Sequence, residues 1–105
     1  MKRRYEALQE FFLGYFHPDW HLDANSWIEV ADDFRNTADS KLVNHVLADL
    51  REVIAEPVSD AELNTTIMHD YSLFYDPSSD GFTMRAWFEE LLRDLQAGQM
   101  PPKHW

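Results

Sequence analysis

Residues 39–54 decide the fold class, and they read DSKLVNHVLADLREVI. Apolar residues recur here at intervals of three and four, which places them along one side of an α-helix. Those residues are Leu42, Val43, Val46, Leu47, Leu50, Val53 and Ile54. Asp39 or Ser40 caps the start of the helix, and Pro57 stops it. The stretch therefore predicts an amphipathic helix of about four turns that buries one side in a core.

Helical spacing continues on both sides of this stretch. Ser-x-x-Glu capping boxes stand at residues 26–29 and 59–62, Thr83 can cap a last helix, and Pro18 ends the first one. The one strand candidate is residues 73–75, which we discount because a lone strand has no partner. The segments 19–25 and 76–81 are predicted loops. The further predicted helices cover about residues 3–16, 26–37, 59–71 and 83–97.

The length and composition of the chain limit which classes of protein it can belong to. The chain has 105 residues, the usual size of one domain. A chain of this size buries roughly 65% of the surface of its unfolded form. It contains no cysteine, which excludes a disulfide scaffold, a thiol nucleophile and a Cys-ligated zinc site. We therefore expect one compact all-α domain over residues 1–105, a bundle of about five helices with a tail at 98–105.

The net charge narrows the possible partners. Nineteen acidic residues against nine Lys and Arg give a net charge of −10 at pH 7. This balance argues against nucleic acid or an anionic membrane as partner, because Lys and Arg supply the affinity for both. Six acids and one base lie in residues 19–39, and eight acids and one base in residues 49–80. If these acids lie on the surface, they either keep the protein soluble or attract a basic protein.

From the sequence we expect neither a membrane-spanning helix nor a signal peptide. No apolar run is long enough to cross a bilayer, and polar residues from Tyr5 to Glu10 interrupt any signal peptide.

Two short segments hold groups that could bind a metal, and neither forms a complete site. Residues 17–23 (HPDWHLD) combine two His with two Asp, but their spacing matches no known metal site. Residues 76–81 (DPSSDG) are similar to the start of a calcium loop, yet Trp87 stands where a bidentate Glu is needed. No nucleophile elbow frames any Ser. We therefore expect no enzymatic activity, metal or cofactor, and keep a metal-dependent hydrolase at residues 17–23 as the weakest alternative.

Residues 12–20, FLGYFHPDW, carry a family resemblance. They resemble the opening motif of small immunity proteins from bacterial contact-dependent growth inhibition (CDI) systems: Leu or Phe, then Gly, Tyr-Phe-His, any residue and Asp-Trp. Later features of that family look like Ser59-Asp60-Ala61-Glu62-Leu63 and Arg85-Ala86-Trp87-Phe88 here. Pro18 stands where the family often has a polar residue, and residues 73–81 match it poorly. The similarity covers most of the chain.

The resemblance implies a cytoplasmic all-α protein that binds the C-terminal toxin domain of a large secreted exoprotein. Immunity proteins of this kind neutralise by stoichiometric binding, commonly over or near the active site. Several such toxins are nucleases, whose cationic clefts hold phosphates. An acidic helical protein can offer carboxylates where phosphates would lie. The alternative is a small acidic adaptor or nucleic-acid mimic that binds a basic host protein.

We choose the residues of a possible partner surface by their charge and their expected exposure. The motif residues, in contrast, are expected to be structural, because their aromatic rings continue the buried stripe of the first helix. In that role Trp20→Ala costs roughly 3–5 kcal/mol if the ring is buried. The expected partner residues are Asp19, Asp23, Asp32, Asp33, Asp76 and Asp80, with Tyr75 as an apolar anchor. The expected structural residues are Tyr15, Phe16, His17, Asp19 and Trp20.

Overall fold

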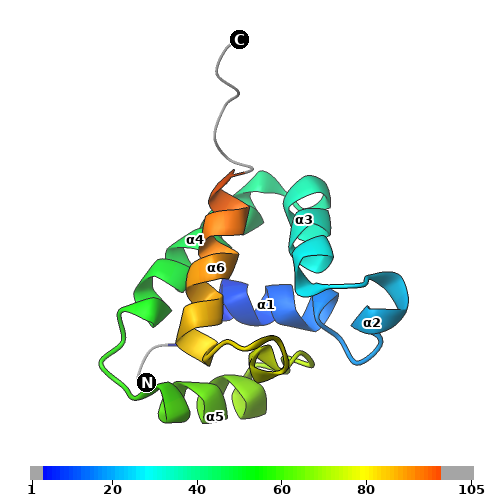
Figure 1. Ribbon diagram of the computed structural model, residues 1–105. Coiled ribbons are helices and arrows are strands. Elements are labelled where there is room, and N and C mark those ends of the chain that lie inside the picture. Colours follow the sequence, from blue (N-terminus) through cyan, green and yellow to red (C-terminus); the bar gives the residue numbers. More distant parts are fainter. Residues whose placement is uncertain (1–3, 98–105) are drawn as a thin grey trace.

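The computed structural model describes residues 4–97, with every side chain in that range except that of Asp23. Over this range the chain forms six α-helices and one short 3₁₀-helix and no strand (Figure 1), which confirms the predicted all-α class. No helix among these residues has the length and apolar character needed to cross a bilayer. The elements are α1 (Glu6–Tyr15), α2 (Trp20–Asp23), α3 (Trp27–Thr37), α4 (Ser40–Ile54), α5 (Asp60–Asp70), η1 (Pro77–Asp80) and α6 (Met84–Ala97).

The predicted capping residues begin four of the helices. The hydroxyls of Ser26, Ser59 and Thr83 each accept a hydrogen bond from the backbone N–H three residues later, at 3.4, 3.1 and 3.1 Å. The carboxylate of Asp39 accepts one from the N–H of Lys41 at 2.8 Å. Each bond satisfies an N–H group that the first turn of a helix leaves without a partner. The starts of α3, α4, α5 and α6 are therefore set by local sequence.

The start of α1 depends instead on residues far away in the sequence. The buried carboxylate of Asp49, in α4, accepts a hydrogen bond from the N–H of Leu8 at 3.2 Å. The hydroxyl of Tyr71, just after α5, accepts one from the N–H of Tyr5 at 2.9 Å. The predicted start at residue 3 is too early, because the helix begins at Glu6 where these contacts hold it.

Helix α6 lies at the centre of the bundle. It packs against α3, α4 and α5, while α1 packs against α3 and α4 (Figure 1). The core between them is aromatic: the rings of Phe12 and Trp87 lie 6.0 Å apart, and those of Phe11 and Phe34 lie 4.1 Å apart. These four side chains are completely buried, so the apolar sides of α1, α3 and α6 meet in one core.

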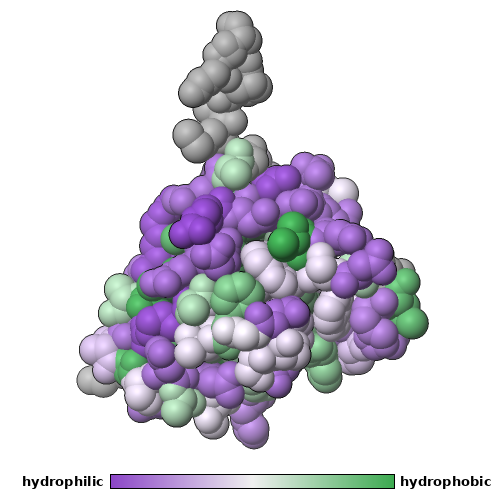
Figure 2. All heavy atoms as spheres, viewed as in Figure 1, coloured by the Kyte–Doolittle hydropathy of each residue, from purple (hydrophilic) through white to green (hydrophobic). Residues whose placement is uncertain are grey.

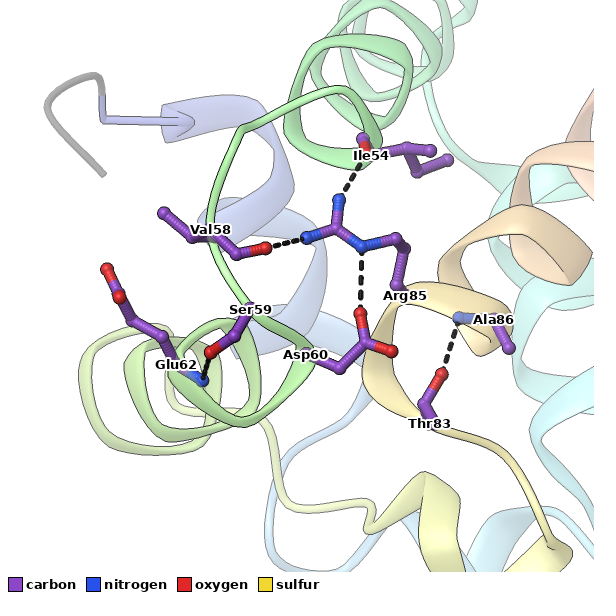
Figure 3. Close-up of polar contacts among 8 residues, drawn as sticks. All are labelled: Ile54, Val58, Ser59, Asp60, Glu62, Thr83, Arg85 and Ala86. Carbon is purple, nitrogen blue, oxygen red and sulfur yellow. Dashed lines mark hydrogen bonds and ion pairs between the residues drawn. The ribbon is translucent and has the colours of Figure 1, made fainter.

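Arg85 joins three elements that are separate in the sequence (Figure 3). Its guanidinium donates to the carbonyls of Ile54, at the end of α4, and Val58, in the following loop. The Nε atom donates to the carboxylate of Asp60, at the start of α5, at 2.9 Å. The two later family-like segments, residues 59–63 and 85–88, therefore contact each other in the fold.

Two segments differ from the predicted loops. Residues 19–25 are expected to form a loop, but Trp20–Asp23 make one helical turn, closed by the N–H of Ala24 donating to the carbonyl of Trp20 at 3.1 Å. Part of the second expected loop is the 3₁₀-helix η1, whose start Asp76 caps. Residues 72–76 have no regular structure. The predicted tail at 98–105 lies outside the described residues.

Candidate functional site

The turn after α1 forms one wall of a cleft. Pro18 disfavours helical backbone at His17, so α1 ends at Tyr15. The N–H of Trp20 then donates to the carbonyl of His17 at 3.0 Å, and the N–H of Asp19 donates to Nδ1 of His17 at 3.2 Å. Because Nδ1 accepts a hydrogen bond, a neutral His17 carries its proton on Nε2. The turn is thus held by its own backbone and one imidazole.

Trp20 connects this turn to the segment that follows α5. Its indole Nε1 donates to the carbonyl of Phe74 at 2.8 Å. Its half-buried ring lies 6.0 Å from the ring of Phe16 and 5.6 Å from that of Tyr75. In Figure 1 the chain after α5 comes to lie beside the C-terminal end of α1. Trp20 therefore fixes the position of α2 against residues 72–76.

An open cleft of about 440 Å³ lies between the end of α1, α2 and α3. Motif residues supply one wall, and α3 supplies the other with two carboxylates, Glu29 and Asp33. We name this hollow the acidic cleft. Carboxylates beside aromatic rings suit a Lys or Arg side chain, through charge-assisted hydrogen bonds and cation–π contact. The acidic cleft is lined by Gly14, Tyr15, His17, Trp20, Ala24, Glu29, Val30 and Asp33.

The walls of the acidic cleft are held by hydrogen bonds. The hydroxyls of Tyr15 and Thr37 lie 3.0 Å apart and share a hydrogen bond, which joins α1 to α3. The carboxylate of Glu29 accepts from the N–H of Asn25 at 3.3 Å. Of the five motif residues expected to be structural, Phe16 is completely buried, Tyr15, His17 and Trp20 are half-buried, and Asp19 is exposed. The motif therefore both packs the core and lines the cleft.

The exposed acids predicted for the partner surface lie at different places. Asp33 lines the acidic cleft, whereas Asp76 lines a second hollow of about 360 Å³ together with Asp60. Asp19 is exposed and precedes α2, and its side chain makes no capping hydrogen bond. Asp80 is exposed and is the last residue of the 3₁₀-helix η1. The structure therefore does not gather these carboxylates in one cleft. Asp23 ends α2, and its side chain is outside the described part.

Asp32 differs from the other predicted acids because its carboxylate turns towards α6. Its Oδ1 atom is buried and lies 3.1 Å from Nη1 of Arg35, which also donates to the carbonyl of Asp94 at 2.8 Å. Burial is the main reason that the pKa of Asp94 is raised to about 6, and a hydrogen bond with Asp32 raises it further. The charge of Arg35 lowers the pKa and offsets part of this shift. This group joins α3 to α6, while the side chain of Asp32 as a whole is 40% exposed, so its part in a partner surface stays a prediction.

The structure also corrects the expectation for Tyr75, which is buried and cannot serve as an exposed anchor. Its side chain is 4% exposed and its hydroxyl donates to Asp80 at 2.5 Å. Burial and this carboxylate raise the pKa of the Tyr75 hydroxyl. Leu73 is also buried, whereas Phe74 between them is 53% exposed. Alternation of side chains along an extended segment is the sequence signal that identifies Phe74.

The face of the molecule drawn in Figure 2 offers mainly polar groups. Hydrophilic residues predominate on the face in Figure 2, where hydrophobic residues are seen as separate spots. Within residues 4–97, the large apolar side chains with high exposure are Leu13, Leu22, Ile28 and Phe74. Among the residues that the structure describes, no three His, Asp or Glu side chains come together as a metal site.

A protein-family model with the description "CdiI immunity protein" matches residues 4–95. The match includes all elements around the acidic cleft and the turn that carries the Tyr-Phe-His-x-Asp-Trp motif. No curated protein and no solved structure matches the chain.

Proposed function

Because the chain belongs to the CdiI immunity protein family, we propose that it neutralises its cognate CDI toxin domain by forming a stoichiometric complex with it. Its action is binding rather than catalysis. The toxin domain is the C-terminal part of a large secreted exoprotein, and the complex forms in the cytoplasm of the cell that is protected. Family membership over residues 4–95 is the observation that carries this proposal.

The toxin domain is proposed to be a nuclease that is bound at or near its active site. The support is electrostatic: a nuclease holds phosphates in a cationic cleft, and this chain has a net charge of −10. Glu29 and Asp33 of the acidic cleft can receive a Lys or Arg that would otherwise contact a phosphate. The exposed acids Asp19, Asp76 and Asp80 extend the negative surface beyond the cleft.

Co-expression with the C-terminal domain encoded by the adjoining upstream reading frame tests the proposal. Growth should be rescued by the wild-type protein and lost when the toxin domain is expressed alone. A toxin domain that still stops growth in the presence of this protein contradicts the immunity function. Binding to many unrelated basic proteins instead of this one domain would favour the acidic adaptor.

A matched pair of variants tests the role of the acidic cleft. Glu29→Gln with Asp33→Asn removes both charges, while the introduced glutamine amide can still accept the hydrogen bond from the N–H of Asn25. Glu10→Gln with Glu89→Gln changes the net charge equally at exposed positions that do not line the cleft. The first pair should weaken binding to the toxin domain about tenfold or more, and the second less than about threefold. Equal effects would show that the cleft has no special part in binding.

Degradation of RNA by the purified toxin domain tests contact at the active site. Addition of this protein should stop degradation at one equivalent. A stable complex in which the toxin domain still degrades RNA would place the contact away from the active site.

A further inference from the structure

We propose that Phe74 is the apolar anchor of the complex, inserted into an apolar pocket of the toxin domain that Lys or Arg residues border. This inference rests on the proposed function and adds to it the residue on which affinity depends most. It takes the place of the sequence-based expectation for Tyr75, whose ring is buried.

Hydrogen bonds on both sides hold the backbone of Phe74. Its N–H donates to the carbonyl of Phe16 at 3.1 Å, and its carbonyl accepts from Nε1 of Trp20 at 2.8 Å. Both partners belong to the motif turn that also lines the acidic cleft. The position of Phe74 is therefore fixed relative to the cleft.

The neighbouring side chains strengthen this constraint. Leu73 and Tyr75, on either side, are 3% and 4% exposed, and the ring of Tyr75 lies 5.1 Å from that of Trp87 in the core. Two buried neighbours in an extended segment force the side chain between them outwards. Before them, Ser72 has a φ of 53°, a left-handed backbone that a non-glycine residue adopts only when its surroundings hold it.

Phe74 is thus a large ring, 53% exposed, on a backbone that is already ordered. Binding through such a side chain costs little conformational entropy, because the segment does not have to be ordered in the complex. Aromatic residues of this kind are typical anchors of protein interfaces. Such a ring is buried most completely when the partner offers a pocket for it.

The charges near Phe74 indicate the surroundings of that pocket. Asp76 and Asp80 follow it in the chain and are both exposed, and their carboxylates accept hydrogen bonds from Ser78 and Tyr75, which carry no charge. Glu29 and Asp33 lie in the acidic cleft, which Trp20 also lines. An apolar ring flanked by carboxylates complements an apolar pocket flanked by Lys or Arg, as a cationic toxin domain can provide.

Calorimetric titration of the purified toxin domain with three variants tests the inference. Phe74→Ala should raise the dissociation constant about tenfold or more. Phe74→Leu keeps an apolar side chain and should lose less affinity than Phe74→Ala. Leu13→Ala is the matched control, because Leu13 is 54% exposed and lines neither hollow, and it should change affinity less than about threefold. Thermal unfolding of each variant within about 4 °C of the wild-type protein shows that the fold is kept.

The outcomes separate this inference from the proposed function. If the wild-type protein binds and Phe74→Ala binds with less than about a tenfold loss, Phe74 is not the anchor, although the immunity function stands. A loss for Leu13→Ala as large as that for Phe74→Ala also overturns the inference. If the wild-type protein does not bind the toxin domain, the proposed function fails and the inference fails with it.

Discussion

Arg85 satisfies two backbone carbonyls that the end of α4 and the next loop leave without helical partners (Figure 3). Its side chain is only 21% exposed, so water cannot fully replace it. We predict that Arg85→Ala lowers the free energy of unfolding by about 2–4 kcal/mol, because each lost bond involves a charged donor. Urea denaturation followed by circular dichroism measures this difference.

The control for Arg85 is Arg93, whose side chain is 75% exposed and pairs with Glu90 at 2.9 Å. Arg93→Ala should change the free energy of unfolding by less than about 0.5 kcal/mol, as is usual for a surface ion pair. Arg85→Lys should rescue little, because an ammonium group lacks the planar set of donors that reaches three acceptors. Equal destabilisation by Arg85→Ala and Arg93→Ala would contradict the role given to Arg85.

Asp94 makes stability depend on pH. Burial and the neighbouring Asp32 raise its pKa to about 6 in the folded protein, from an ordinary value of 3.8. Between these values the folded state binds more protons than the unfolded state, so stability falls as pH rises from about 4 to about 6. Asp94→Asn removes the carboxyl group that binds this proton. We predict that the stability of the wild-type protein relative to Asp94→Asn declines by about 1–2 kcal/mol from about pH 4 to about pH 7. A constant difference in denaturation experiments would contradict the raised pKa.

At the scale of the elements, α2 is only one turn long, so contacts with other segments must hold its place. The bond from Nε1 of Trp20 to the carbonyl of Phe74 ties it to the segment after α5. We predict that Trp20→Phe costs about 1 kcal/mol, the net value of one hydrogen bond, and speeds amide exchange at Leu22 and Ala24. Tyr15→Phe loses the bond to Thr37 and should leave exchange in α2 unchanged. Unchanged exchange in Trp20→Phe would show that packing alone holds α2.

The long helices could be predicted because their caps and apolar stripes are local in sequence, as Ser59 and Thr83 show. Helix α2 could not, because one turn has no period to detect. The start of α1 depends on Asp49, which reaches it only in the folded chain. The same limit applies to the site. Residue type favours Tyr75 as an anchor, whereas the packing of the folded chain turns Tyr75 inwards and Phe74 outwards.

At the scale of the whole molecule, we propose that the charge of −10 and the acidic cleft act at different stages of binding. A net charge attracts a basic partner over a distance set by the Debye length and so raises the association rate. Carboxylates at the contact itself mainly slow dissociation. The two contributions can therefore be separated by kinetics.

We predict that association with the toxin domain slows about tenfold or more between about 50 mM and about 500 mM salt, while dissociation changes much less. Stopped-flow mixing with the purified toxin domain measures both rates. The two charge-matched pairs, at Glu29 with Asp33 and at Glu10 with Glu89, should reduce the association rate by similar factors because they change the net charge equally. Only the pair in the acidic cleft should speed dissociation. Association that is independent of salt would mean that the acidic surface serves solubility and does not guide the toxin domain to its site.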